Sequence, residues 1–196
     1  MSKSTSLRCA LAGALLMVAS VSQAHTGHGV HGLADGLAHP FMGLDHLLAM
    51  VAVGLWSAAV LPAGRRLLGP GTFVAVLPVG ALLAWGGVQL PAVESGVAAS
   101  VVLLGAMLLA GRRMPASLGL AVTGVAALFH GYAHGSELAV GASAAAYAGG
   151  FMVASVLLHG AGIAAGAGLL RLPAWAAQLA ATVVGGAGMV LLAARL

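Results

Sequence analysis

The chain has 196 residues, of which 61% are hydrophobic and only 6% are charged. This balance excludes a soluble globular domain and indicates a membrane protein, because each bilayer-spanning helix needs about 20 mostly apolar residues. The net charge of +4 gives no support for a nucleic-acid partner, since the basic residues are scattered as pairs between apolar stretches. The single cysteine, Cys9, excludes an internal disulfide and a cysteine metal cluster.

The first segment has the three parts of a secretory signal peptide. A basic start precedes an apolar stretch from Cys9 to Val18, and Ser22-Gln23-Ala24 supplies the small residues of a cleavage site. We therefore expect a cleaved signal peptide over residues 1–24. The alternative is a retained first helix, although the apolar stretch is short for a complete span.

Residues 25–196 are expected to form one transmembrane domain that begins with a short, histidine-rich periplasmic segment. Prolines fall at or beside the breaks between six apolar segments, where a missing backbone donor is least costly. We predict an all-α, multi-pass membrane helix bundle. Its six spans are expected near His39 to Leu61, Leu67 to Leu90, Ala92 to Ala110, Ala116 to Gly135, Ser143 to Leu170 and Ala174 to Ala194.

The arginines between the predicted spans give the expected orientation. Cytoplasmic loops of membrane proteins carry an excess of Lys and Arg. A periplasmic amino terminus places every loop arginine on the cytoplasmic side of a bacterial inner membrane, and only Arg195 falls on the other side. These loop arginines are Arg65, Arg66, Arg112, Arg113 and Arg171.

The first polar cluster stands at the start of the first predicted span, where His39 and Asp45-His46 interrupt an apolar stretch. In a regular helix His39 and His46 lie on one face. Asp45 lies about 100° round from His46, so it can complete a ligand set or hold a neighbouring group in place. The pattern predicts a metal site of imidazole and carboxylate. The alternative is a helix-capping aspartate beside histidines that only pack between helices.

The second polar cluster lies in the outer half of the fourth predicted span. His130, His134 and Glu137 are spaced i, i+4 and i+7, so they form one stripe along a helix. Two helices could then supply four imidazoles and two carboxylates to one cavity. That donor set suits nickel, cobalt, copper or zinc better than calcium or magnesium. The alternative is a set of hydrogen bonds between helices.

The remaining histidines have weaker patterns. His159 lies deeper in the fifth predicted span, on one helix face with Met152, and could act as an inner relay or as a helix-bridging side chain. The segment containing His25, His28 and His31 could capture metal ions at the entrance, or it could be a solvated tail.

Both clusters resemble the signature motifs of the HupE/UreJ family of nickel/cobalt permeases. The similarity is carried by His39-Pro-Phe-Met-Gly-Leu-Asp-His46 and Phe129-His-Gly-Tyr-Ala-His134-Gly-Ser-Glu137, and it covers the expected mature chain in order. The resemblance implies uptake of nickel or cobalt for the maturation of hydrogenase or urease. The family's signature positions are matched at His39, Asp45, His46, His130, His134 and Glu137.

The sequence therefore predicts a transporter, not an enzyme, that moves Ni²⁺ by preference, or Co²⁺, from periplasm to cytoplasm without a prosthetic group. Its expected partners are the metal ion and the lipid bilayer, and association of several copies is left open. The alternative is a haem-binding membrane electron carrier, which would need no carboxylates beside its axial histidines. A second alternative is an intramembrane metallohydrolase, although the chain has no His-Glu-x-x-His motif.

Overall fold

The computed structural model describes residues 32–138 and 142–196. The expected signal peptide over residues 1–24 and the expected capture histidines His25, His28 and His31 lie outside the described residues. Within the described part, the chain forms seven α-helices and two 3₁₀ turns, with no strand, which confirms the all-α prediction. The elements are α2 (Leu33–Met42), α3 (Leu44–Val60), η1 (Ala63–Arg65), α4 (Leu68–Trp85), α5 (Val93–Ala110), η2 (Gly111–Arg113), α6 (Ala116–Glu137), α7 (Ala142–Leu169) and α8 (Ala174–Ala193).

The helices of the described part are long and apolar enough for a multi-pass membrane protein. Five spans, which contain α4 to α8, pass the length and hydropathy requirements individually, and α2 with α3 passes them as a pair. Each of these five helices lies within a few residues of its predicted span. The predicted membrane helix bundle is therefore confirmed, with five candidate spans, and a sixth if the bent pair of α2 and α3 is counted as one span.

The bend corrects the expected first span. A continuous helix from His39 to Leu61 is wrong, because α2 and α3 meet at Gly43 with an angle of 81° between them. Gly43 has an extended backbone (φ −90°, ψ 113°), and Pro40 in the last turn of α2 lacks a backbone donor. His39 and His46 consequently lie on two different helices that meet at the bend, and not on one helix face.

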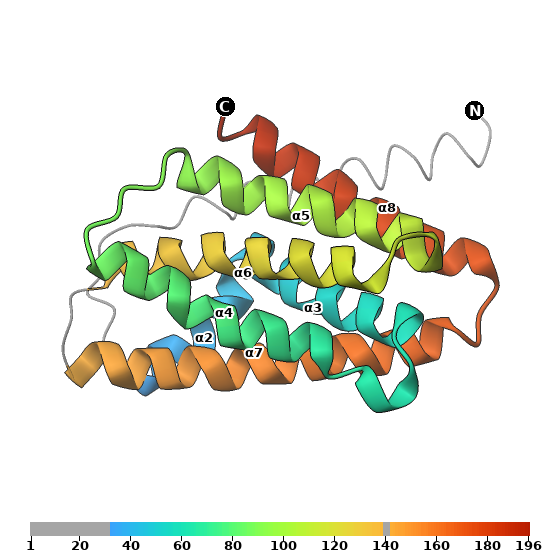
Figure 1. Ribbon diagram of the computed structural model, residues 1–196, viewed down its shortest axis with the longest axis horizontal. Helices are drawn as coiled ribbons and strands as arrows, with labels where there is room; N and C mark the ends of the chain where they lie inside the picture. Colours follow the sequence, from blue (N-terminus) through green and yellow to red (C-terminus); the bar gives the residue numbers. More distant parts are fainter. Residues whose placement is uncertain (1–31, 139–141) are drawn as a thin grey trace.

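Close backbone approach holds the bundle together. Helix α7 packs against α2 and α3, α6 against α4, and α8 against α5, as Figure 1 shows. Small residues permit these contacts: Gly105 of α5 meets Gly185 of α8, and Gly54 of α3 meets Gly162 of α7. This packing is typical of membrane helices, because lipid provides no hydrophobic driving force for their association.

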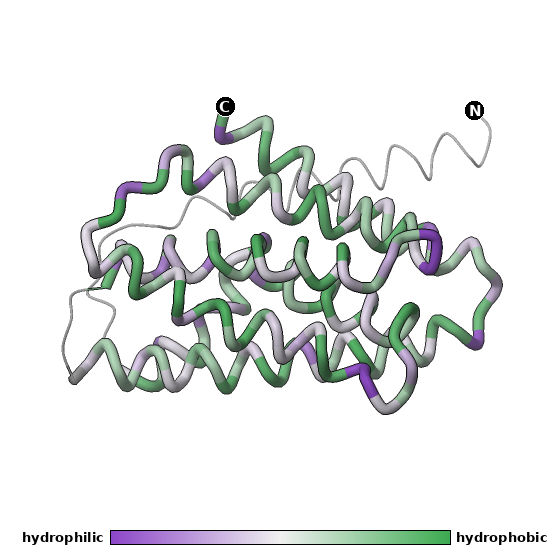
Figure 2. The backbone as a smooth tube through the Cα atoms, in the orientation of Figure 1, coloured by the Kyte–Doolittle hydropathy of each residue, from purple (hydrophilic) through white to green (hydrophobic). Residues whose placement is uncertain are grey.

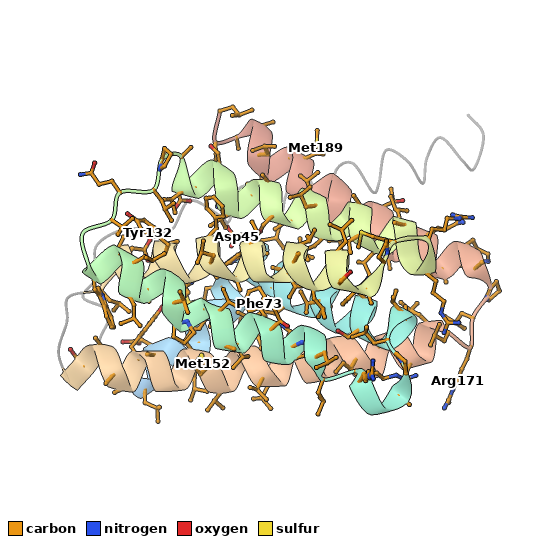
Figure 3. All side chains as sticks on the ribbon, in the orientation of Figure 1. Asp45, Phe73, Tyr132, Met152, Arg171 and Met189 are labelled. Carbon is orange, nitrogen blue, oxygen red and sulfur yellow. The ribbon has the colours of Figure 1, made fainter. Side chains whose placement is uncertain are left out.

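Charge is distributed unequally between the two ends of the bundle. The turns η1 and η2 and the connection between α7 and α8 lie together at one end, and each carries a strongly hydrophilic segment in Figure 2. Arg171 projects from this end in Figure 3. Of the arginines that the structure describes, Arg195 alone lies near the other end, beyond α8. The connections therefore alternate between an arginine-rich end and an end that carries the two polar clusters.

Candidate metal centre

Three histidines from three helices converge in the half of the bundle away from the arginine-rich end. His39 of α2, His46 of α3 and His134 of α6 each offer one ring nitrogen, and these three nitrogens lie within 4.8 Å of one another. His46 and His134 are buried, and His39 is half-buried. Metal–imidazole bonds are about 2.0–2.1 Å long, so ligands of one ion lie at most about 4.2 Å apart. Small movements of the rings would let all three nitrogens bind one ion.

Asp45 contacts the Nδ1 side of the His46 ring. One carboxylate oxygen, Oδ1, accepts a hydrogen bond from the His46 backbone N–H at 2.7 Å and also contacts His46 Nδ1. Because the carboxylate accepts, Nδ1 carries the proton and Nε2 presents its lone pair. This is the carboxylate–histidine arrangement that orients metal-binding imidazoles. Asp45 thus lies as a partner of His46, the second of the two roles that the sequence left open.

The bend at Gly43 makes room for this contact. A Cβ atom at Gly43 would lie 2.8 Å from His46 Nδ1 and 3.0 Å from Asp45 Oδ1, closer than packed atoms normally approach. The helix break and the absence of a side chain at residue 43 therefore both make room for the contact between Asp45 and His46.

His46 and His134 face each other directly. Their Nε2 atoms are 2.5 Å apart, and their ring centroids are 4.5 Å apart. This is hydrogen-bonding distance, so in the absence of a metal ion one Nε2 carries a proton and donates it to the other, and a bound cation would take the place of that proton. Glu137 lies at the margin of this group, with its Oε2 atom 4.0 Å from His134 Nδ1 and its side chain 37% exposed. Its carboxylate is not among the converging ligand atoms.

His130 lies beside the three converging histidines and is fully buried. Its ring centroid is 4.6 Å from that of His46, and its Nε2 atom is 3.1 Å from the Ser100 hydroxyl. Ser100 donates its only hydroxyl proton to the Val97 carbonyl at 2.7 Å, so His130 Nε2 must be the donor to Ser100. His130 Nδ1 therefore carries a lone pair, and it is buried without a hydrogen-bond partner. Such an orphaned acceptor beside His46 could accept a metal ion.

Phe73 of α4 contacts both His130 and His159. Its ring centroid is 5.8 Å from His130 and 5.0 Å from His159, and Figure 3 shows it inside the bundle. His159 Nδ1 donates to the Ser155 carbonyl at 2.6 Å, which leaves a buried Nε2 lone pair without a hydrogen-bond partner. His159 is thus a second buried imidazole with one lone pair, on a helix, α7, that supplies none of the three converging histidines.

Met152 borders a cavity beside His134. A cavity of about 210 Å³ opens between α4, α6 and α7, and both His134 and Met152 contribute to its wall. The rest of the wall is apolar and includes Leu77, Trp85 and Phe151. The pairing of Met152 with His159 as an inner relay stays a prediction, and Met152 also contacts the cavity beside His134.

The sequence pattern missed one residue of this site, Arg195. Its Nη2 atom donates to Asp45 Oδ2 at 2.6 Å, and its Nη1 atom donates to the Glu94 carbonyl at 3.0 Å. The available signal was its position, since it is the one arginine that breaks the expected charge asymmetry of the loops. An arginine at the end of the bundle opposite the arginine-rich end needs an acidic partner there, and the buried Asp45 is one.

Comparison with known proteins places these residues in a family. Residues 13–191 match the family model described as HupE / UreJ protein. Protein HupE of Rhizobium leguminosarum bv. viciae is 41% identical over 175 residues, which cover 89% of this chain and 89% of that protein. No solved structure matches the chain.

Proposed function

The chain belongs to the HupE/UreJ family, and on this premise we propose that it carries a divalent transition-metal ion, Ni²⁺ by preference or Co²⁺, across a bacterial inner membrane. The proposed direction is from periplasm to cytoplasm, where the ion would serve the maturation of hydrogenase or urease. The observation that carries the proposal is the convergence of His39, His46 and His134, from three separate helices, inside an apolar bundle.

The physical argument begins with the cost of moving an ion into a membrane. The idealised cost of burying even a monovalent ion is on the order of 20 kcal/mol, so ligands must replace the water around a divalent one. Neutral imidazoles suit nickel and cobalt, whereas magnesium and calcium prefer oxygen ligands. Packing alone does not account for three buried or half-buried imidazoles with converging nitrogens.

The proposed route runs along the bundle. His25, His28 and His31 would capture the ion, and the outer site would be formed by His39, His46 and His134, with His130 completing it. Asp45 would orient His46, and Glu137 would attract cations at the margin. The ion would then pass Phe73 to His159 and leave at the arginine-rich end, which the positive-inside rule assigns to the cytoplasm.

Uptake of radioactive nickel tests this proposal in cells that lack their own nickel importers. The variants are His46→Ala and His130→Ala, compared with the intact protein at matched membrane expression, with cobalt as competitor. Met189→Ala is the control, because the Met189 side chain is exposed on α8 and is not among the converging ligands. We expect both histidine variants to lose uptake and the control to retain it.

Two results would contradict the proposal. Normal uptake in both histidine variants would remove these residues from the transport site. An absorption spectrum of the purified protein with an intense haem Soret band would instead support the electron carrier, since histidines on neighbouring spans can serve as axial ligands.

A further inference from the structure

Arg195 occupies a place where a charged residue is costly. It follows the last turn of α8, and its side chain is only 15% exposed in the structure. An arginine buried in a membrane protein is expensive and normally faces an interior partner. Its partners here come from α3 and from the start of α5, so it joins three helices near the outer site.

The guanidinium is held on several sides. Its Nη2 atom donates to Asp45 Oδ2 at 2.6 Å, and its Nε atom lies 3.6 Å from Glu94 Oε2. The Arg195 backbone is fixed as well, since the Ser95 hydroxyl donates to its carbonyl at 3.1 Å. A planar guanidinium that contacts two carboxylates has little freedom to turn away.

These contacts determine what Asp45 can do. Its Oδ1 atom faces His46 and its Oδ2 atom faces Arg195, so both carboxylate oxygens are already used. Asp45 is also only 4% exposed, and a buried carboxylate that lost its cation would be left uncompensated. Its Oδ2 atom would then be available as a hard oxygen ligand that competes with the imidazoles for the ion.

We propose that Arg195 is a positioning residue of the metal site: it keeps Asp45 turned toward His46 and out of the set of metal ligands. The chain of contacts runs from Arg195 through Asp45 and His46 to His134. This inference rests on the proposed function of the histidines as a metal site. It adds that the end of α8 determines the donor set that an ion meets.

The test is Co²⁺ binding by the purified, full-length protein, because the visible absorption bands of cobalt report both affinity and donor set. Arg195→Gln is expected to weaken binding by about 10- to 100-fold, the usual effect of losing an outer-shell partner, and to change the spectrum toward oxygen ligation. Arg195→Lys should restore most of the affinity and the original spectrum, because a cation again faces Asp45. Arg171→Gln, at the opposite end, is the charge-matched control and should behave as the intact protein.

A double-variant comparison keeps the test decisive if Arg195→Gln does not fold. Because Arg195 acts through Asp45, Asp45→Asn and the double variant Asp45→Asn/Arg195→Gln should bind Co²⁺ within about 3-fold of each other. A further large loss in the double variant, or unchanged affinity and spectrum in a folded Arg195→Gln protein, would overturn the role of Arg195. Failure of the intact protein to bind Co²⁺ or Ni²⁺ would instead reject the proposed function itself.

Discussion

The described part of the bundle holds its histidines in two contrasting settings, one near the outer end and one nearer the arginine-rich end. On the outer side, His39, His46 and His134 come from three helices, and their nitrogens lie within 4.8 Å of one another. On the inner side, His159 is bonded to the Ser155 carbonyl of its own helix and offers one lone pair. Several converging donors can replace most of the water around an ion, whereas one imidazole can only assist its passage.

This difference suggests a division of labour. The outer site would determine which ion is bound and how tightly, and the inner site would affect how fast the ion leaves. A transported ion must be bound strongly enough to enter and weakly enough to leave. Loss of one imidazole should therefore lower the affinity for the ion at the outer site, and it should lower the rate of transport at the inner site.

The largest effect is expected from His46→Ala. Structural zinc sites gain about 10–16 kcal/mol from about four ligands, so losing one ligand removes about 3 kcal/mol, or on the order of 100-fold in affinity. Co²⁺ titration of the purified protein measures this loss, with Met189→Ala as control. A His46→Ala protein that binds Co²⁺ with normal affinity would remove the outer histidines from the binding site.

A smaller effect with a different signature is expected from His159→Ala. Loss of one transient contact worth about 1.4 kcal/mol slows transport about 10-fold, while the affinity of the outer site should stay within about 2-fold. Nickel uptake and Co²⁺ titration of the same variant separate the two quantities. If affinity fell together with uptake, His159 would belong to the same site as the outer histidines, and the contrast between the two regions would fail.

The sequence predicted most of this architecture for physical reasons. The spans that became α4 to α8 are long apolar stretches with prolines beside their breaks, and bilayer thickness sets their length. The bend at Gly43 was missed because the apolar pattern continues through it. Pro40 and Gly43 together were the available signal, since one lacks a donor and the other tolerates close approach.

The site was only partly predictable. The stripe of His130 and His134 follows from helical periodicity, because both lie on α6 four residues apart. The contact between Asp45 and Arg195 joins residues 150 positions apart in the chain, so no local pattern indicates it. The cavity wall that Met152 shares with His134 likewise depends on which helices face α7, and spacing along α7 does not reveal this.

Gly43→Ala tests how far the outer site depends on the bend. The new Cβ would lie 2.8 Å from His46 Nδ1, so the imidazole must shift. We expect stability to fall by about 1–3 kcal/mol, as in other overpacked positions, and Co²⁺ affinity to fall several-fold. Gly71→Ala is the matched control, because a Cβ there meets nothing within 4 Å. Thermal unfolding and Co²⁺ titration check both, and equal behaviour of the two variants would show that the bend tolerates a side chain.

The smallest effect is expected from Met152→Leu, which tests whether the Met152 thioether acts at the outer site or with His159. Met152 shares a cavity wall with His134, yet the wall around it is apolar, and a thioether is a soft ligand that suits Cu(I) better than Ni²⁺. Leucine conserves the volume, so stability should change by less than about 1.5 kcal/mol and nickel uptake by less than about 2-fold. A loss of uptake as large as that of His159→Ala, with affinity unchanged, would instead assign Met152 to the inner relay. A loss of Co²⁺ affinity would make it a ligand of the outer site, and its cavity would then be the entrance through which an ion reaches His134.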